Sequence, residues 1–537
     1  MLINGLPSVI MLVMDETVYT IPAFFARSVA LRGDEPALGF IRDGEMQWRT
    51  WRQVADEVAN LAAALCTAGI EPGDRIAQVS ENRYEWVITD LAIHLAGAVH
   101  VPMHVTLSGE QIAQQIDDCG ARLVFVSSAK LLATFADRID SSVRVVLHDE
   151  QGEGREKTLL DEPAVAPSPQ SPAPSPDALA TILYTSGTTG QPRGVMLSQQ
   201  NLATNAAAIA DALGGGAGHT RLGILPLSHI FARTCDMYTW LYCGSKLVLA
   251  EGRETLARDL GLARPTILNA VPYLYQKMAD QIRAGGSGDE SAALQNYFGG
   301  RVQILNSGGA ALSPETEAWY AECGLRILPG YGLTEASPVI SACTPPAHRS
   351  GSVGPLMRDV EVRLADDGEI LVRGPNVMLG YWRDEAATAE AIRDGWLHTG
   401  DLGELDADGF LFIRGRKKEL IVLSTGKKVL PSRVESLLTV SPLIEQAAVF
   451  GDGQASLTAL IVPTARVFAR SEERGSSNET IAAEIHRCLK SAAHEEQVRR
   501  FVLLDRPFSI ERGELTPKMS LCRKVIAANF ATEIKLM

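Results

Sequence analysis

One stretch of the chain, residues 184–195, holds the residue types best suited to chemistry, and it reads YTSGTTGQPRGV. It combines three glycines with four hydroxyl side chains and one strong cation, Arg193. Glycine lets backbone N–H groups come close to an anion, hydroxyl groups add donors, and a guanidinium can hold phosphate oxygens through two donors. This composition predicts a loop that binds a polyphosphate.

Apolar runs on both sides of this loop indicate that it joins two strands. Residues 179–184 precede it, and VMLS follows Gly194. The loop differs from the P-loop of kinases and GTPases, because that motif needs Gly-x-x-x-x-Gly-Lys-Ser/Thr leading into a helix. The alternative without a binding function is an ordinary hairpin turn of Gly and Thr, and a run of twelve residues of this composition disfavours it.

Two further segments carry ligand-binding chemistry. NSGGAAL at 306–312 follows a strand-like run, and in open α/β sheets ligands bind at the carboxyl ends of strands. In ILPGYGLTEAS, which comes next, Tyr331 can offer a flat face to a purine and Gly332 admits close approach. Thr334 and Glu335 can reach phosphate and Mg²⁺, since magnesium needs few carboxylates when phosphate oxygens are present.

A second dense patch, residues 395–435, contains HTGD and DADGF. HTGD predicts a turn in which the two oxygens of Asp401 can accept both vicinal hydroxyls of a ribose. DADGF is typical of an Asp-Gly hairpin turn. Each motif alone is more often a surface turn than a site, so the assignment of Asp401 depends on its neighbours in the chain.

Length and composition narrow the class of protein. The 537 residues are too many for one hydrophobic core and indicate two or more domains. A formal net charge of −14 disfavours nucleic acid, whose phosphate backbone attracts cations. The eight cysteines form no Cys-x-x-Cys pair, so we expect neither a zinc site nor a disulfide framework, and a cytoplasmic location fits best.

Two segments stand outside the globular pattern. Residues 1–16 are apolar, contain no basic residue and are too short to cross a bilayer, so we expect an extra strand or a tail and leave open a peripheral membrane contact. Residues 161–177 are rich in Pro, Ser and Ala, which predicts a linker just before the phosphate loop. Elsewhere strand-like and helix-like runs alternate, which predicts an α/β fold.

Three histidines invite a metal assignment. His94, His100 and His104 lie six and four residues apart in a helix-to-strand transition. No two of them share one face reliably at these spacings, so we expect packed or solvated side chains.

The motifs, in this order, resemble the signature of the adenylate-forming (AMP-binding) superfamily, which includes acyl-CoA synthetases, firefly luciferase and peptide-synthetase adenylation domains. The resemblance covers about residues 20–530, and LPLSHIFAR at 225–233 is most similar to long-chain fatty acyl-CoA synthetases. The family usually has lysine where this chain has Arg193. The positive charge is kept, but the compact ammonium group of lysine is replaced by the planar guanidinium group of arginine.

The resemblance implies an α/β fold with a large N-terminal domain and a small mobile C-terminal domain. A large N-terminal domain, residues 17–417, would hold stacked α/β/α/β/α subdomains and a small β-subdomain. A small α+β domain, residues 418–537, would follow and rotate about a hinge at Lys418.

The resemblance also implies ATP, Mg²⁺ and coenzyme A as cofactors. It assigns catalytic roles to Thr188, Arg193 and Glu335, with Glu335 as the metal ligand. The other cofactor contacts it implies are Thr185, Ser186, Gly187, Thr189, Gly190, Gly309, Tyr331, Gly332, Thr334, Asp401, Arg416 and Gly426. His229 and Phe231 are the candidates for lining and gating an acyl pocket.

One position departs from the family. Its C-terminal domain carries a lysine that meets the substrate carboxylate and ATP, and the segment ELTPKMSLCRKVI at 514–526 has Ser520 in that place. Lys518 lies two residues earlier, on the same side of an extended strand. Our hypothesis is that Lys518 takes over the role.

The resemblance implies activation of a fatty acid, most like a long-chain one, by ATP to acyl-AMP, and then thioester formation with coenzyme A. AMP and pyrophosphate are released. One alternative is an acyl-AMP ligase that loads an acyl carrier protein or another acceptor, because the first half-reaction is identical. The other is a nucleotide- or acyl-binding protein without turnover, which only Ser520 favours.

Overall fold

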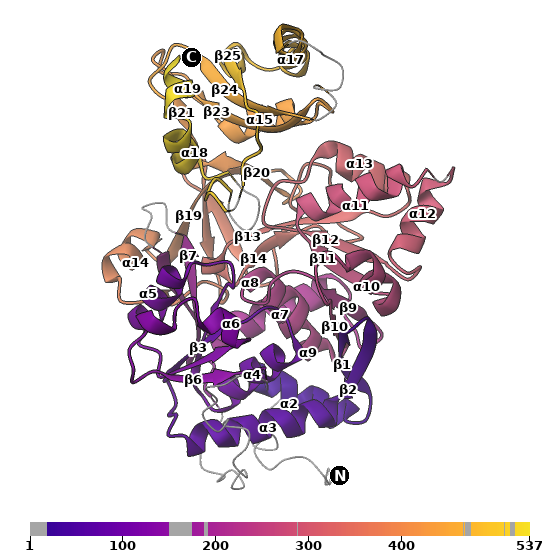
Figure 1. Cartoon of the computed structure of the whole chain (residues 1–537), viewed down its shortest axis with the longest axis vertical. Helices are drawn as coiled ribbons and strands as arrows, with labels where there is room; N and C mark the ends of the chain where they lie inside the picture. Colours follow the sequence, from indigo (N-terminus) through magenta and orange to yellow (C-terminus); the bar gives the residue numbers. More distant parts are fainter. Residues whose placement is uncertain are drawn as a thin grey trace.

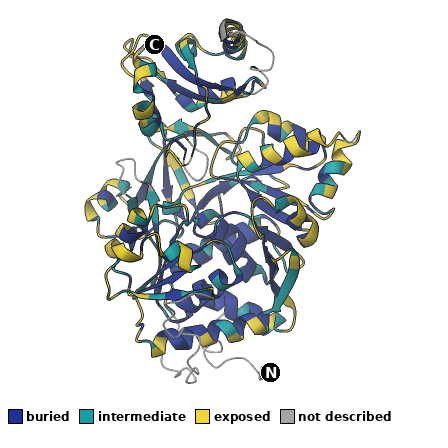
Figure 2. Cartoon of the chain, in the orientation of Figure 1, coloured by how far each residue is buried: buried dark blue, intermediate teal, exposed yellow. Residues whose placement is uncertain are grey.

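The computed structural model describes residues 19–149, 174–186, 192–286, 288–464, 467, 474–509, 511–515 and 521–536. A large body contains most of the chain, and a smaller lobe at one end of it is formed by the last fifth of the sequence (Figure 1). Buried residues fill the middle of the large body and form a separate centre in the small lobe (Figure 2).

The first sheet of the large body carries the strands on both sides of the predicted phosphate loop. Its order is β17-β8-β7-β4-β3-β5-β6. The pairs among β7, β4, β3, β5 and β6 are parallel, whereas β8 runs antiparallel to both β7 and β17. The strands are β3 Arg75–Val79, β4 Val99–Met103, β5 Leu123–Val126, β6 Arg144–Leu147, β7 Leu179–Ser186, β8 Pro192–Ser198 and β17 Gly380–Tyr381.

The second sheet has eight strands in the order β14-β13-β12-β11-β9-β10-β1-β2. Its interior is parallel, and its edge strands β2 and β14 are antiparallel to their neighbours. The strands are β1 Pro36–Arg42, β2 Glu45–Thr50, β9 Thr220–Gly223, β10 Lys246–Leu249, β11 Ile267–Ala270, β12 Ile304–Ser307, β13 Ile327–Gly332 and β14 Val339–Ala342.

Helices between these strands pack on the sheets, as short αβ connections require. They are α2 Ile21–Arg32, α3 Trp51–Thr67, α4 Tyr84–Leu95, α5 Gly109–Cys119, α6 Ala129–Leu132, η1 Ala136–Arg138, α7 Gln199–Ala212, α8 Ile230–Ala232, α9 Thr239–Cys243, α10 Leu256–Ala263, α11 Pro272–Ala284, α12 Glu290–Tyr297, α13 Pro314–Glu322, η3 Thr334–Ala336 and α14 Glu385–Ala391. Between α8 and α9 the helix widens into a π-helical turn, η2 Arg233–Tyr238.

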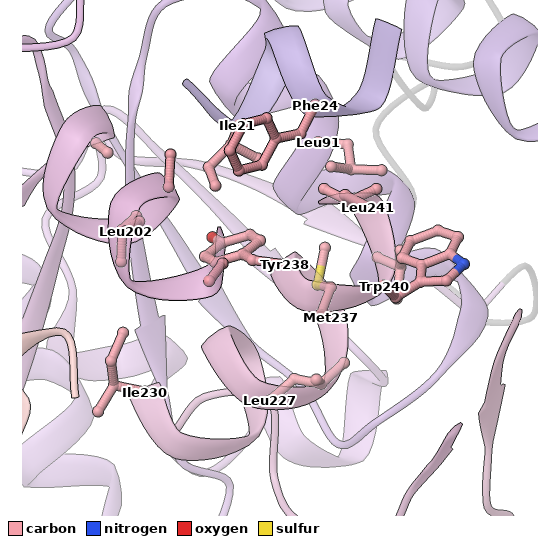
Figure 3. Close-up of a cluster of buried hydrophobic side chains, with 14 of the residues drawn as sticks. Ile21, Phe24, Leu91, Leu202, Leu227, Ile230, Met237, Tyr238, Trp240 and Leu241 are labelled. Atoms are coloured by element: carbon pink, nitrogen blue, oxygen red, sulfur yellow. The ribbon is translucent and has the colours of Figure 1, made fainter. Parts of the chain in front are cut away.

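The largest core cluster joins helices from distant parts of the sequence. Side chains from α2, α4, α7, α8, η2 and α9 meet in it, and Figure 3 shows Phe24, Leu91, Leu202 and Tyr238 among them. The indole rings of Trp51 and Trp240 stack with their centroids 4.7 Å apart. This core fixes α8 and η2, which carry residues of the predicted acyl pocket.

A third, antiparallel sheet leads to the small lobe. It has the order β15-β16-β19-β18, with β20 also paired to β19. Its strands are β15 Glu361–Leu364, β16 Glu369–Arg373, β18 Ile392–Arg393, β19 Trp396–Leu405 and β20 Leu411–Arg416.

The small lobe has its own sheet, β23-β24-β25, and a two-stranded ribbon, β21-β22. Its elements are η4 Lys417–Glu419, β21 Ile421–Val422, β22 Lys428–Val429, α15 Pro431–Thr439, β23 Ile444–Phe450, β24 Leu457–Pro463, α17 Arg474–Cys488, η5 His494–Glu496, β25 Val498–Leu503, α18 Arg523–Asn529 and α19 Ala531–Leu536. Two clusters of buried apolar residues lie within this lobe, which confirms an α+β unit with its own core.

Two helix starts follow from the sequence, which offers Thr50 as the cap of a helix within residues 48–64 and Ser198 as the cap of the helix that begins near Asn201. Both predictions are confirmed, because Thr50 and Ser198 cap α3 and α7 through reciprocal hydrogen bonds with Gln53 and Asn201, the arrangement that satisfies two free donors at a helix start. Residues 48–50 pair with β1 in strand β2, so the helix itself begins at Trp51, directly after its cap.

Candidate active site

The strands on either side of the phosphate loop are confirmed. β7 and β8 form an antiparallel pair in which Thr185 lies opposite Arg193 and Ser186 opposite Pro192. A Cβ at Gly194 would lie 2.7 Å from Cγ2 of Ile182, so close packing of the strand requires glycine there. The predicted contacts Gly187, Thr188, Thr189 and Gly190 lie outside the described residues.

Arg193 and Glu335, predicted from separate motifs, lie around one tyrosine. The guanidinium of Arg193 lies 5.4 Å from the centroid of the Tyr381 ring, and the Tyr381 hydroxyl donates a hydrogen bond of 3.0 Å to Oε1 of Glu335. Nε of Arg193 lies 3.6 Å from Oδ2 of Asp384. A cation and a carboxylate are thus held close to each other at the base of the phosphate loop.

Glu335 reaches this position because the chain turns sharply after β13. A Cβ at Gly332 would lie 1.8 Å from the carbonyl oxygen of Pro338, so only glycine fits between the two segments. Thr334 and Glu335 then form the short turn η3, and the backbone N–H of Met378 donates to the Glu335 carbonyl at 2.9 Å.

The predicted ribose carboxylate is in place, but its local structure differs from the prediction. Asp401 was expected in a turn, and that was wrong: it lies inside β19, where it pairs with Arg416 of β20. Gly400 has a φ of +71°, which gives HTGD a turn-like residue, yet the flanking residues pair with β16 and β20. Strand pairing outweighs the local preference for a turn.

Asp401 is almost fully buried and contacts two donors. The Tyr331 hydroxyl donates to its Oδ2 at 2.7 Å, and Nε of Arg416 lies 2.9 Å from its Oδ1. Burial raises the pKa of Asp401, and the charge of Arg416 opposes that rise. Each carboxylate oxygen can accept more than one hydrogen bond, so both retain capacity for ligand hydroxyls.

A narrow cavity brings five of the predicted residues of the large body together. Its volume is about 60 Å³, and Phe231, Gly309, Tyr331, Gly332 and Thr334 all line it. The other lining residues are mostly apolar: Ile209, Ala212, Leu213, Ile230, Cys235, Asn269, Asn306, Ser307, Gly308, Leu328, Gly330, Leu333, Pro338, Val339, Ala342 and Met357. Ligand cavities usually measure roughly 300–1,000 Å³, so the walls must move apart to admit a ligand.

Phe231 and His229 have different surroundings. The Phe231 ring packs against Gly308, where a Cβ would lie 3.0 Å from the ring atom Cζ. His229 precedes α8 and does not line this cavity; its ring centroid lies 5.2 Å from that of His104. The cavity geometry therefore supports Phe231 as an acyl-pocket residue more directly than His229.

Lys418 and Gly426 lie in the small lobe. Lys418 is in η4, directly after β20, and Gly426 is in the turn between β21 and β22 with a φ of +79°. Lys518 and Ser520 fall outside the described residues.

Glu369 connects η4 to the backbone beside Asp401. The backbone N–H of Gly400 donates to Oε1 of Glu369 at 3.0 Å, while Nζ of Lys417 lies 3.0 Å from its Oε2 and 2.5 Å from Asp367. One buried carboxylate thus contacts both the backbone next to Asp401 and a residue of η4.

Sequence reasoning missed a buried polar cluster. His94 and His100 are fully buried, as packed histidines would be, but both lie beside Asp90, whose Oδ1 is 2.5 Å from Nη2 of Arg233. Burial would raise the pKa of Asp90, but Arg233 with the histidines holds it well below its usual range. Burial lowers the pKa of His100 to about 4.

Tyr381 and Asp384 were also missed. They lie in GYWRDEAATAEA, at 380–391, where an aspartate before an alanine-rich run signals a helix start, and Asp384 does cap α14. That signal could have located the helix, but contact with the phosphate loop depends on β17 pairing with β8 from a distant part of the chain.

Comparison with known proteins assigns this fold and site to a family. Residues 25–382 match the family model described as AMP-binding enzyme, and residues 418–537 match the AMP-binding enzyme C-terminal domain. The chain belongs to the AMP-binding enzyme family. The resemblance seen in its motifs and the predicted adenylate-forming fold are both confirmed.

Members of this family with similar sequences include two long-chain enzymes. Long-chain-fatty-acid–CoA ligase FadD15 of Mycobacterium tuberculosis is 34% identical, with 92% of each chain covered. Long-chain-fatty-acid–CoA ligase 1 of Homo sapiens is 29% identical, with 97% of this chain and 86% of the relative covered.

A solved structure shares the fold over nearly the whole length of the chain. The anthranilate CoA ligase AuaEII in complex with anthranoyl-AMP has a TM-score of 0.83 at 21% identity, covering 98% of this chain and 100% of the other.

Within the part of our chain that the structure describes, no helix is long and apolar enough to cross a membrane.

Proposed function

We propose that the protein is an AMP-forming acid–thiol ligase. It activates a long-chain fatty acid with ATP to acyl-AMP and transfers the acyl group to coenzyme A, releasing AMP and pyrophosphate. The observation that carries this is the arrangement of Arg193 and Glu335 around Tyr381, together with Asp401 bound to Tyr331 beside an apolar cavity. The names of the long-chain relatives support the substrate class.

The residues present fit a magnesium nucleotide. Tyr381 binds one oxygen of the Glu335 carboxylate, which leaves the other for a cation, and Mg²⁺ favours a single carboxylate with phosphate oxygens. When bound, Mg²⁺ would neutralise charge on the pyrophosphate leaving group. Thr188, which we expect to donate to the phosphates, stays a prediction.

In the first half-reaction a carboxylate oxygen of the fatty acid attacks the α-phosphorus of ATP, and the bond to the pyrophosphate oxygen breaks. Arg193 binds the phosphates as charge moves onto the leaving group. Asp401 accepts hydrogen bonds from the ribose, and Tyr331 and Gly309 border the base. The protein's contribution is to align two anions that repel each other in solution.

The acyl chain enters the cavity beside Phe231. The cavity walls come from α7, α8, β12, β13 and β14, and they are apolar over most of their area, as burial of a hydrocarbon chain requires. Since the cavity of about 60 Å³ is too small for a hydrocarbon chain, movement of Phe231 away from Gly308 is the simplest way to enlarge it.

The second half-reaction involves the small lobe. We propose domain boundaries at residues 17–417 and 418–537, with Lys418 as the hinge and the Gly426 turn brought to the site for thioester formation. The family-model match that begins at residue 418 and the separate core of the small lobe support this division. Lys518 remains the candidate for the adenylation lysine.

Exchange of radiolabelled pyrophosphate into ATP tests the proposal. We expect exchange only when a fatty acid is present, with rates that peak at long chains in a panel of graded length. Exchange without any acid, or none with every acid, would contradict the proposed ligase activity. Supplying free coenzyme A or an acyl carrier protein as acceptor then distinguishes the thioester ligase from the carrier-loading alternative.

A further inference from the structure

The segment 378–384 is bonded to both halves of the proposed phosphate site. In β17, Tyr381 pairs with Val195 of β8, and the backbone N–H of Trp382 donates to the Gly194 carbonyl at 2.7 Å. Three residues before Tyr381, the N–H of Met378 donates to the carbonyl of Glu335. The backbone of this segment therefore fixes the strand that carries Arg193 relative to the turn that carries Glu335.

Two side chains of the segment contact the functional groups themselves. Tyr381 donates to the Glu335 carboxylate at 3.0 Å, with its ring beside the Arg193 guanidinium, and Asp384 lies 3.6 Å from Nε of Arg193. Burial and the adjacent charge of Glu335 raise the pKa of Tyr381, so its hydroxyl stays protonated and can donate.

Hydrogen bonds with the following helix hold the backbone of Tyr381 and Asp384, and the side chain of Asp384, in position. The N–H of Tyr381 donates to Oγ1 of Thr388 at 2.8 Å, and the Thr388 hydroxyl donates to the Asp384 carbonyl at 2.8 Å. Oδ1 of Asp384 accepts from the N–H of Ala387 and so caps α14. A capped helix start restrains the Asp384 carboxylate to few rotamers, with Oδ2 directed to Arg193.

We propose that Tyr381 and Asp384 are positioning residues for magnesium-bound ATP, an inference that rests on the proposed function. Tyr381 holds one oxygen of Glu335 so that the other faces the cation. Asp384 pairs with Nε of Arg193, so this carboxylate does not occupy the terminal nitrogens, from which the guanidinium can donate to phosphate oxygens. The three donors of lysine share one nitrogen, whereas arginine can pair with Asp384 through Nε and present separate nitrogens to phosphate in a fixed plane, so the pair Arg193–Asp384 gives a reason for arginine at a position where lysine is usual.

A purely structural role is the competing explanation, because Asp384 is a helix cap and Tyr381 lies in a strand. The variants Tyr381→Phe and Asp384→Asn separate the two. Phe keeps the ring, and Asn is as good a cap as Asp, so folding should be preserved in both variants. Matched controls are Tyr242→Phe, whose hydroxyl contacts Asp211, and Asp289→Asn, which caps α12 in the same manner.

The experiment measures equilibrium binding of ATP by calorimetry, once with Mg²⁺ and once with EDTA, together with the thermal midpoint. For Tyr381→Phe we expect the dissociation constant of Mg·ATP to rise about tenfold, the effect of losing a hydrogen bond to a charged group, while metal-free ATP binds within about twofold of wild type. For Asp384→Asn we expect both forms to bind several-fold more weakly. Thermal midpoints should stay within about 2 °C.

A double variant tests the link between Asp384 and the arginine. In an Arg193→Lys background, Asp384→Asn should cause no further loss, because the lysine makes no Nε contact for Asp384 to hold. Two results would overturn the positioning role. One is unchanged ATP binding in both single variants. The other is a Tyr381→Phe variant that loses affinity equally for Mg·ATP and metal-free ATP and also has a lower thermal midpoint. A wild-type protein that binds no ATP would instead overturn the proposed function.

Discussion

Two networks in this protein use the same residue types in opposite surroundings. One is centred on Arg233 and lies among fully buried helices, and the other is centred on Arg193 and lies at the base of the phosphate loop. Each joins an arginine to an aspartate and a tyrosine. The side chain of Arg233 is 0% exposed, whereas that of Arg193 is 29% exposed.

The buried network engages both oxygens of its carboxylate with protein side chains. Asp90 lies within hydrogen-bond distance of Arg233, His100 and Tyr238, and Arg233 also donates to the Thr181 hydroxyl in β7 at 2.8 Å. It ties α4, β4, η2 and β7 together beneath the strand that leads to the phosphate loop. Its expected role is to fix these elements relative to one another.

The open network keeps hydrogen-bonding groups available for a ligand. Nε of Arg193 contacts Asp384, and one carboxylate oxygen of Glu335 accepts a hydrogen bond from Tyr381. The comparison indicates that burial, and not the choice of residues, separates a structural ion pair from a binding site. Breaking the first network should therefore reduce stability, and breaking the second should reduce binding and turnover.

The largest effect is expected from Arg233→Met. This change leaves the Asp90 carboxylate buried without its cation, which should lower the free energy of unfolding by about 3–5 kcal/mol. Urea unfolding followed by fluorescence measures it, and Arg193→Met serves as the matched control with little loss. Adding Asp90→Asn to Arg233→Met should recover part of the stability, and no recovery would contradict the assignment of an uncompensated charge.

Glu335→Gln should have the opposite profile. The amide keeps an acceptor for Tyr381 but removes the negative charge for the metal, so pyrophosphate exchange should fall by about 10²–10³-fold, as for the loss of one preorganised electrostatic contact. The urea midpoint should match that of wild type. Exchange within threefold of wild type would show that Glu335 is not the metal ligand.

A pH effect of intermediate size should come from the buried network. The pKa of His100 is about 4 in the folded protein and 6.5 for the free side chain. The unfolded chain therefore takes up the proton first, so stability is fully present above pH 6.5 and is lost as the pH falls toward 4, by at most about 1.4 kcal/mol per pH unit.

Urea midpoints measured between pH 7 and pH 4 check this, with His100→Gln expected to flatten the profile. His148, whose pKa burial also lowers to about 4, provides the comparison variant His148→Gln. Asp90 contributes outside this window, because its stabilisation is lost only below its free value of 3.8. An unchanged slope in His100→Gln would exclude His100 as the source.

The smallest effect is expected at an exposed ion pair. Arg373 and Glu361 contact each other across β15 and β16, with side chains 50% and 59% exposed. Glu361→Gln should change the free energy of unfolding by about 0–1 kcal/mol and leave nucleotide binding unaltered. A loss of unfolding free energy as large as that of Arg233→Met would show that burial does not determine how much an ion pair contributes to stability.

The sequence predicted those parts of the site that are encoded locally. The β7–β8 hairpin, the caps at Thr50 and Ser198, and the α+β unit after η4 depend on residues close together in the chain. Glu335 and Asp401 were placed through motifs whose order in the chain is informative.

Other features depend on contacts between distant segments. Asp90 and Arg233 are 143 positions apart, and Arg193 meets Tyr381 only because β17 joins the edge of the first sheet. Composition at either end of such a pair gives no sign of the other. At Asp401 a local signal is overridden by distant contacts. Thr-Gly-Asp predicts a turn, but pairing with β16 and β20 makes this segment a strand.

Glu369 has a consequence for anyone who studies domain rotation by mutagenesis. It accepts from the backbone beside Asp401 and also binds Lys417, the residue before the proposed hinge. A substitution at Lys417 is therefore expected to change two measurements at once, the proposed rotation of the small lobe and the proposed binding of ribose by Asp401. Genetic dissection of the two requires Asp367→Asn, which weakens the hold on Lys417 and leaves the Glu369–Gly400 bond in place.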